Sequence, residues 1–239
     1  WLTRFYIKQA IPHVLGFRIT NSVELKSLLT NWGVPLDQIL LLYSLYLDFD
    51  VFRPISVPIE YDAIFVGRLT DNKAPHLFLD GVAKAADQKK DIRVLIVGQG
   101  PLVSGLHQRT IKLGLSQNVE FKDWVSNSTE LANYYRRSRC LVCTSYSEGG
   151  PRVVAEALAC GTPIITTRVG LANELIKDGV NGFFIDWSVD MLENRLMQII
   201  SDTNLRDRMA SEAPRSVQRY EKDRVMSEYV SCYKQLISQ

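Results

Sequence analysis

The sequence predicts an α/β fold built on a doubly wound parallel sheet, and three observations support this prediction. From Tyr61 onward, short apolar runs alternate with amphipathic segments of helical length. Three of the runs are apolar throughout, which is typical of strands that helices cover on both faces. Four of the six runs end in glycine or threonine, which favours a turn into the next segment. Since parallel strands need crossover connections, the alternation indicates a parallel sheet between two helical layers.

The elements of this domain follow from that pattern in chain order. Strands are expected at 63–67, 94–98, 119–121, 140–144, 164–167 and 183–185. Helices are expected at 74–87, 102–114, 128–137, 151–160, 171–178 and 188–202. Ligands bind outside the carboxyl ends of the strands in such sheets, so the loops that follow the strands are the expected place for a site.

The two ends of the chain do not follow the alternation. A strand at 17–20, a helix at 21–31 and a strand at 39–43 are too little for an independent domain. We therefore interpret residues 1–57 as the end of a preceding domain plus a linker with two prolines at 53–59. The doubly wound domain is expected at 58–216, and the segment 217–239 reads as a long last helix rich in Tyr and charge.

Composition excludes several classes of protein. The 239 residues carry a net charge of +2, which gives no electrostatic argument for nucleic-acid binding. Four cysteines do not make a disulfide framework, so a reducing cytoplasm is the expected compartment. Cys140 and Cys143 have a C-x-x-C spacing, but inside a strand they point to opposite faces and are expected in the core. No run approaches the roughly 20 apolar residues of a membrane span.

The loop after the first strand is basic, and the loop after the second is rich in glycine. Arg68 and Lys73 follow Gly67, and an arginine fork with a mobile lysine charge suits phosphate oxygens. Two solvated surface cations are the simpler alternative. Gly98 and Gly100 would let the backbone approach a flat ligand, although a plain turn explains them as well. Position 103 is Val, so the dinucleotide fingerprint G-x-G-x-x-G is absent.

The stretch "SEGGPRVVAEALACGTP" at 147–163 places two carboxylates around a helix start. Pro151 is expected as the first helical residue, and Gly149 and Gly150 remove side chains that would block a phosphate at the helix N-terminus. Glu156 would lie roughly 7–8 Å beyond Pro151 along the helix. Its neighbours are apolar, so its carboxylate needs a partner. Glu148 and Glu156 can therefore flank a nucleoside diphosphate, one at each side of the phosphates.

Four segments resemble the retaining GT-B glycosyltransferases of the fourth sequence family, which use nucleotide sugars. The segment "FVGRLTDNKAPHLFLDGV" (65–82) is similar to the family's V-G-R-L-x-x-x-K motif, and "VLIVGQGPL" (94–102) to its second strand and glycine loop. The segment "SEGGPRVVAEALACGTPII" (147–165) looks like its E-x7-E signature, and "GLANELIKDGVNGFFI" (170–185) like the next helix and strand. The order and spacing agree over most of the chain.

This resemblance implies roles for individual residues. Arg68 and Lys73 would bind the donor pyrophosphate and offset the charge of the leaving group. Glu156 would bind the ribose hydroxyls, and Glu148 would face the donor sugar near the reacting centre. The further donor-binding residues that it implies are Gly67, Gly98, Val125, Gly149, Gly150 and Pro151. Such enzymes need no cofactor and no bound metal, because the cationic pair stabilises the diphosphate, and they retain the anomeric configuration.

The resemblance also implies what lies outside the residues given. Family enzymes carry a whole N-terminal domain that binds the acceptor, and only its last part fits in residues 1–57. We therefore interpret the chain as the donor-binding part of a truncated enzyme, with the helix at 217–239 crossing to the N-terminal domain. A glycan, a lipid or a small molecule is the expected acceptor. Contact of the aromatic and basic start with the inner face of a membrane is a further possibility.

Two departures and two alternatives accompany this interpretation. The first acid is followed by Gly-Gly-Pro where the family often has Gly-Phe-Gly, and Gly170-Leu171 stands where a glycine pair is common. A nucleotide-sugar binding module without catalysis is one alternative. An epimerase or phosphorylase of the same architecture is the other, although no further acid/base cluster supports it.

Overall fold

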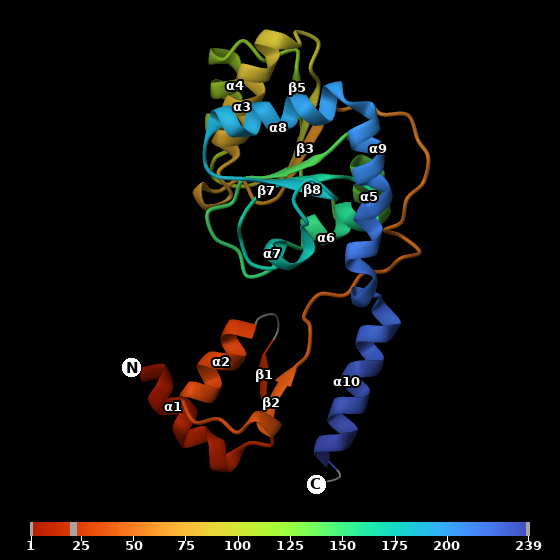
Figure 1. The fold of residues 1–239 in the computed structure, drawn as a ribbon. Coiled ribbons are helices and arrows are strands. Elements are labelled where there is room, and N and C mark those ends of the chain that lie inside the picture. Colours follow the sequence, from red (N-terminus) through yellow and green to blue (C-terminus); the bar gives the residue numbers. More distant parts are fainter. Residues whose placement is uncertain (1, 20–22, 238–239) are drawn as a thin grey trace. The chain divides into compact units, whose positions relative to one another are not determined.

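The computed structural model describes residues 2–19 and 23–237 (Figure 1). The chain divides into two compact units, which are described separately. The larger unit is Leu47–Gln218, and the smaller one combines Trp1–Tyr46 with Arg219–Gln239. The predicted strand residue 20 and the predicted helix start at 21–22 lie outside the described residues.

The larger unit contains a six-stranded sheet in the order β5-β4-β3-β6-β7-β8. Every neighbouring pair of strands is parallel. This confirms the predicted α/β fold with a parallel sheet. The strands are β3 (Ala63–Val66), β4 (Val94–Val97), β5 (Val119–Lys122), β6 (Leu141–Cys143), β7 (Ile164–Thr167) and β8 (Gly182–Ile185).

Helices cover both faces of this sheet. On one face lie α3 (Pro75–Gln88), α4 (Val103–Lys112) and α8 (Val189–Ser201), as Figure 1 shows. On the other lie α5 (Ser128–Arg136), α6 (Arg152–Ala159) and the short α7 (Ala172–Leu175). A further helix, α9 (Thr203–Glu212), and a 3-10 segment, Ala213–Tyr220, follow α8.

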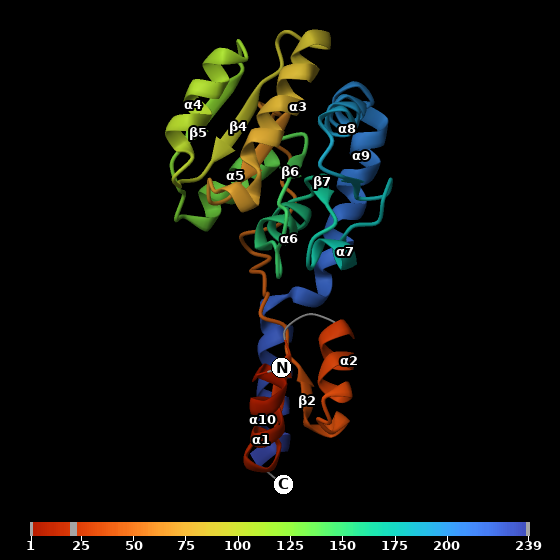
Figure 2. The ribbon, with the colours of Figure 1, turned by 90° about the vertical axis from the view of Figure 1, so that its left-hand side faces the viewer.

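The two helical layers explain the apolar strands. All four residues of β4 and of β3 are buried, because each strand has helices above and below it. On one face, α3 and α8 lie side by side (Figures 1 and 2). Gly81 makes this close approach possible, since a Cβ there would lie 2.6 Å from the Leu192 side chain. The core therefore fixes the strand ends that carry the loops.

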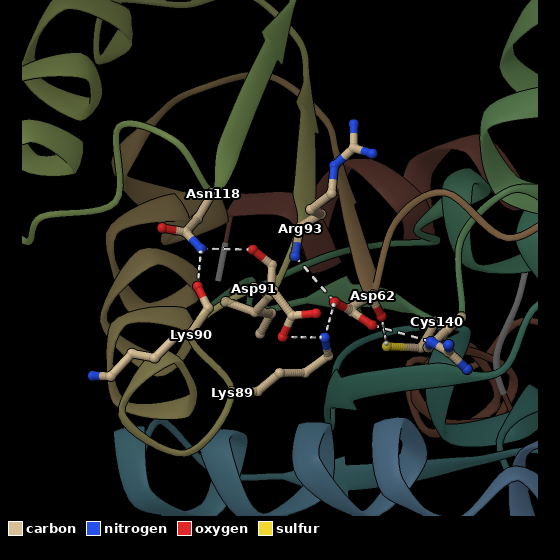
Figure 3. Close-up of polar contacts among 9 residues, drawn as sticks. Asp62, Lys89, Lys90, Asp91, Arg93, Asn118 and Cys140 are labelled. Atoms are coloured by element: carbon tan, nitrogen blue, oxygen red, sulfur yellow. Dashed lines mark hydrogen bonds and ion pairs between the residues drawn. The ribbon is translucent and has the colours of Figure 1, made fainter.

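A polar cluster at the amino ends of the strands holds α3, β4 and β6 together (Figure 3). Asp62, directly before β3, accepts hydrogen bonds from the Arg93 backbone N–H and the Arg139 side chain, each at 3.0 Å. The Lys89 ammonium lies 3.7 Å from the same carboxylate. Asp62 is buried, and these partners compensate its charge. This end of the sheet is opposite to the loops in which a ligand is expected.

The structure differs most from the predicted helices at three places. The helix predicted at 171–178 ends at Leu175, because the Asp178 and Asn181 side chains accept backbone N–H groups and Gly179 turns the chain with φ 76°. The helix α9 was not predicted. The last helix begins at Lys222 and not at 217, since a 3-10 segment precedes it.

The smaller unit has its own small core. It contains α1 (Leu2–Ala10), β1 (Phe17–Ile19), α2 (Val23–Asn31), β2 (Ile39–Leu41) and α10 (Lys222–Ile237). Strands β1 and β2 are parallel, and Ile19, Leu29, Val34 and Ile39 are buried between them and the helices. The Tyr229 hydroxyl in α10 donates to the Tyr43 backbone oxygen at 2.9 Å. The assignment of these residues to an acceptor domain stays a prediction.

None of the helices in the described part of the chain is long and apolar enough to cross a membrane.

Candidate functional site

The sheet order creates a switch point between β3 and β6. From β3 the chain moves outward through β4 and β5, and it returns to the other side of β3 as β6 before continuing through β7 and β8. Doubly wound sheets bind ligands outside the carboxyl ends of the strands at such a point. The loops that follow β3 and β6 carry most of the predicted site residues, so the topology brings these residues to one place.

Lys73 and Glu148 form an ion pair across this switch point. Lys73 belongs to a 3-10 turn, Asp71–Lys73, after β3, and Glu148 lies in the loop after β6. The Lys73 ammonium donates to Glu148 Oε1, and the Ser145 hydroxyl donates to the same oxygen at 2.8 Å. Only 20% and 13% of the two charged side chains are exposed. The ammonium is therefore held at the switch point, partly shielded from solvent.

Hydrogen bonds from two side chains fix the two loops against each other. The Thr144 hydroxyl lies 2.9 Å from the backbone oxygens of both Lys73 and Ala74. The Asn72 side-chain amide donates to the Ser147 backbone oxygen at 2.8 Å. Ala74 has φ 46°, a left-handed conformation that is uncommon for a residue with a Cβ. Thr144 and Asn72 were not among the predicted site residues, yet they position Lys73.

Gly170 supports the loop that carries Glu148. Its φ is 44°, and a Cβ at this position would overlap the backbone oxygen of Glu148. The backbone of the following loop therefore lies directly against the backbone of the Glu148 loop. The sequence shows Gly170 only as the one glycine at a place where a pair is common. The structure shows that it is needed for packing against the Glu148 loop.

The start of α6 differs from the prediction by one residue. Pro151 has ψ 94° and is the N-cap, so the helix begins at Arg152. The Pro151 backbone oxygen accepts from the Val154 N–H at 3.0 Å. Gly149 and Gly150 precede it and are exposed, and no atom lies within 4 Å of where a Gly149 Cβ would be. The positive end of the α6 dipole thus faces a loop with open space beside it.

Glu156 is buried in α6 and holds two hydrogen-bond donors. The Tyr135 hydroxyl, from α5, donates to Oε2 at 3.1 Å. The Arg152 guanidinium, one turn earlier in α6, donates to Oε1 at 2.8 Å. Only 6% of Glu156 is exposed. The sequence predicted that this carboxylate needs a partner, and these two side chains fulfil that need.

Burial raises the pKa of the Glu156 carboxyl above its usual value. The hydrogen bond and the positive charge of Arg152 lower the pKa, as does the Tyr135 hydroxyl, but they do not cancel the effect of burial. Burial, followed by the nearby Glu156 charge, also raises the pKa of the Tyr135 hydroxyl well above its usual value. Tyr135 is therefore a hydrogen-bond donor throughout the physiological range.

Arg68 and Val125 lie at the same rim of the sheet as the residues described above. Arg68 directly follows Gly67 at the end of β3 and is exposed, and it forms no ion pair with any residue that the structure describes. Val125 is half-buried in the loop between β5 and α5. Beside it, 53% of Trp124 is exposed. The structure thus places an exposed cation and a half-buried apolar side chain on either side of the β4 loop.

Gly67 and Gly98 bring the first two loops together. A Cβ on Gly98 would overlap the Gly67 backbone oxygen, and a Cβ on Gly100 would overlap the Leu69 backbone oxygen. The glycines of the second loop are therefore needed for packing between the loops. The sequence suggests a different reason for them, the close approach of a ligand to the backbone. A Cβ on Gly67 would lie 3.9 Å from the Lys73 side chain, so Gly67 borders the candidate site directly.

Cys140 and Cys143 are buried free thiols, as the strand periodicity predicts. In the described ranges, no group of three or more His, Cys, Asp or Glu is placed to hold a metal ion.

Comparison with known proteins shows which proteins the chain is similar to. The family model described as glycosyl transferases group 1 matches residues 53–216. A D-inositol 3-phosphate glycosyltransferase of Corynebacterium urealyticum is 32% identical over 194 residues, which are 77% of this chain and 45% of the relative. The corresponding protein of Mycolicibacterium smegmatis is 37% identical over 58% of this chain and 34% of its own length. The chain thus spans less than half the length of these relatives.

Solved structures share the fold. The C-terminal domain of a group 1 glycosyl transferase from Francisella tularensis covers 74% of this chain, with 99% of its own length matched, a TM-score of 0.66 and 25% identity. HepE of Anabaena, solved with UDP-glucose, has a TM-score of 0.78 and 23% identity over 99% of this chain and 67% of its own. The pneumococcal O-GlcNAc transferase GtfA, solved with UDP and GlcNAc, reaches 0.83 with 17% identity over 98% of this chain and 47% of its own.

Proposed function

The chain belongs to the group 1 glycosyl transferases, and from this premise we propose that it binds a nucleotide-diphosphate sugar and serves as the donor-binding part of a glycosyltransferase. The proposal includes transfer of the sugar to an acceptor with retention of configuration. The observation that carries it is the Lys73–Glu148 pair at the switch point, beside a helix start and a buried Glu156. The UDP and sugar ligands of the fold relatives HepE and GtfA support this class of donor.

In this proposal, the diphosphate lies over the start of α6. Lys73 and Arg68 supply positive charge from the β3 side, and Gly149 and Gly150 leave room for phosphate oxygens near the helix N-terminus. Cleavage of the sugar–phosphate bond leaves negative charge on the diphosphate. Preorganised cations and backbone dipoles stabilise such charge, which is the principal means by which this site would accelerate the reaction without a metal.

Donor binding requires Lys73 to exchange partners. In the structure its ammonium is paired with Glu148, and a diphosphate offers a stronger, doubly charged partner. When Lys73 turns to the phosphates, Glu148 is released to accept hydroxyl hydrogens of the donor sugar, while Ser145 keeps its position through the 2.8 Å hydrogen bond. The ion pair is thus a resting state that keeps both charges compensated until the donor arrives.

Glu156 is suited to bind the ribose. Each of its oxygens accepts one hydrogen bond in the structure, and an ionised carboxylate can accept about four. Two ribose hydroxyls can therefore donate to Glu156 without displacing Tyr135 or Arg152. The half-buried Val125 is the proposed wall of the base pocket.

The acceptor side of the proposal depends on residues outside this chain. A glycan, a lipid or a small molecule is the proposed acceptor class, and an N-terminal domain is the proposed partner that binds it. A cytoplasmic location, at the inner face of a membrane if the acceptor is a lipid, completes the proposal.

Titration calorimetry with UDP, GDP and ADP, and then with their sugars, tests the donor site. One nucleotide is expected to bind with the nucleotide sugar competing for the same site, and Arg68→Ala is expected to weaken that binding. If no nucleotide binds to a chain that melts cooperatively, the proposal is wrong. Binding without sugar transfer by this chain alone agrees with a donor-binding part.

A further inference from the structure

Two half-exposed aromatic side chains lie together at the carboxyl rim of the sheet, outside the residues proposed for the donor. Tyr146 is in the loop after β6, and Trp187 follows β8. Their ring centroids are 5.7 Å apart, with an angle of 33° between the planes. The exposed fractions are 46% for Tyr146 and 49% for Trp187. The two rings lie against each other and together form a small exposed aromatic surface at the rim.

Tyr146 is held by the same two loops that carry Lys73 and Glu148, whereas Trp187 lies in the loop after β8. The Tyr146 backbone N–H donates to the Asn72 backbone oxygen at 2.8 Å. The Tyr146 hydroxyl lies 3.4 Å from Nε2 of His76, which is in the first turn of α3. Any group resting on the aromatic pair would therefore lie beside the Lys73 loop, next to the proposed reaction centre.

A groove of mixed polar and apolar lining begins at His76. It lies between the Asp71–Lys73 turn, the start of α3 and α4, and its volume is about 280 Å³. That is near the lower limit of about 300 Å³ for small-molecule pockets. Its lining mixes polar side chains, Asp71, Gln108, Arg109 and Lys112, with the apolar Leu102, Leu106 and Leu113. Donors and acceptors are thus mixed along the groove, and neither sign of charge dominates it.

We propose that Trp187, Tyr146, His76 and this groove form a subsite for an oligosaccharide, which holds sugar units of a glycan acceptor beyond the one that reacts. Sugar rings present C–H groups that pack on the negative face of aromatic rings, and their hydroxyls suit a mixed polar lining. The inference rests on the proposed function, because it assigns a glycan as the acceptor.

The surface is poorly suited to a protein or to a lipid tail. Its apolar part is the aromatic pair and, separately, the leucines that line the groove, whereas interaction patches for those partners are contiguous over several hundred Å². Exposed polar side chains, Asp186 beside Trp187 and Arg109 in the groove, border the apolar part. An oligosaccharide matches this alternation of rings and polar groups along the rim.

Saturation-transfer NMR and calorimetry on the full chain test this subsite. The probes are a panel of tetra- to hexasaccharides of α- and β-linked glucose, galactose, mannose and N-acetylglucosamine. At least one is expected to bind, with saturation transferred to ring C–H protons. Trp187→Ala and Tyr146→Ala should each weaken that binding about tenfold. Tyr134→Ala, on α5 at the opposite face of the sheet, serves as the control and should leave it unchanged.

Nucleotide titrations on the same variants separate this inference from the proposed function. Trp187→Ala is expected to bind the nucleotide as tightly as the unsubstituted chain and to melt at the same temperature. Failure of every oligosaccharide to bind, or equal binding by both rim variants, would overturn the subsite while leaving the donor site intact. Oligosaccharide binding without nucleotide binding would uphold the subsite and refute the donor site.

Discussion

Lys73 and Glu148 connect the resting structure to the proposed reaction, because each is the partner of the other until a donor arrives. Ser145 and Thr144 hold this pair from β6, and neither could be found from the spacing of charged residues. The sequence indicated which residues carry the charge, whereas the structure shows which neighbours keep the charge in place.

Substitutions of Lys73 and of Glu148 are expected to change the affinity for the nucleotide in opposite directions. Lys73→Ala removes a charge-assisted contact worth about 1.5–3 kcal/mol, so the nucleoside diphosphate should bind roughly 10–100-fold more weakly. Glu148→Gln frees Lys73 and removes a negative charge, so the same nucleotide should bind more tightly while sugar transfer by the complete enzyme is lost. Calorimetry measures the nucleotide affinity of both variants. Weaker binding by Glu148→Gln would contradict the exchange of partners.

The raised pKa of Glu156 predicts a pH dependence of nucleotide binding. Ribose hydroxyls donate to the ionised carboxylate, so the affinity should fall as the pH decreases through the raised pKa, in a window above 4.5, the usual value. Glu156→Gln should bind weakly and lose this dependence. Affinity measured from pH 4.5 to 8 is the check, and identical pH profiles for the two proteins would refute the role of Glu156.

The contribution of Glu156 to folding stability depends on pH with the opposite sign in that window. This difference separates an effect on nucleotide binding from an effect on stability. Because the folded-state pKa is raised, the folded protein binds the proton more readily than the unfolded chain. The contribution of Glu156 to the free energy of unfolding therefore falls as the pH rises through the window. Weaker nucleotide binding at the acidic end cannot then be attributed to unfolding caused by this residue.

At the scale of elements, close contacts between loop backbones shape the site. Gly98 lies against the Gly67 carbonyl, and Gly170 lies against the loop of Glu148. These contacts explain why glycines recur at strand ends here, in addition to any contact with a ligand. A glycine in a sequence does not reveal which of the two reasons applies, since the neighbouring loop comes from a distant part of the chain.

Gly98→Ala is expected to destabilise the larger unit by roughly 2–4 kcal/mol, because a Cβ would overlap backbone that cannot move without shifting β3. Gly105→Ala is the matched control. Gly105 lies in α4 with no atom within 4 Å of the added carbon, so the substitution should stabilise the helix by up to about 1 kcal/mol. Urea unfolding of both variants measures the difference. Equal stabilities would show that the loops do not depend on this contact.

The helices and strands that were predicted correctly share a strong periodic signal. Strands β3 and β4 are continuous apolar runs because two helical layers cover them. The prediction missed α9 because polar residues dominate it and, of its residues, Met209 alone is fully buried. The predicted helix at 171–178 is longer than α7. The side chains of Asp178 and Asn181 end α7 through hydrogen bonds with nearby backbone N–H groups, and the apolar pattern does not reveal such bonds.

At the scale of the whole molecule, the proposed donor site lies within one of the two units. All of the residues assigned to it, from Gly67 to Glu156, belong to Leu47–Gln218. The sequence predicted a boundary at 57/58, and the compact unit begins eleven residues earlier, since Arg136 binds the backbone oxygens of Val51 and Arg53. That contact joins residues more than 80 positions apart and has no signature in the local pattern.

A fragment of residues 47–218 is therefore expected to fold and to bind the nucleotide with the affinity of the full chain. Its own core and its complete sheet supply the stability that the site needs. Thermal unfolding and calorimetry on the fragment, with the Lys73→Ala fragment as control, measure this. Loss of binding in a folded fragment would mean that the smaller unit contributes to the donor site.

The central claim is that the loops after β3 and β6, with α6, form a donor site in which Lys73 exchanges Glu148 for a diphosphate. A crystal structure of the chain with the nucleotide selected by calorimetry tests it most directly. The account predicts the diphosphate beside Lys73 and the start of α6, the ribose hydroxyls on Glu156, and the Lys73–Glu148 pair broken. A nucleotide bound elsewhere, or bound there with that pair intact, would contradict it.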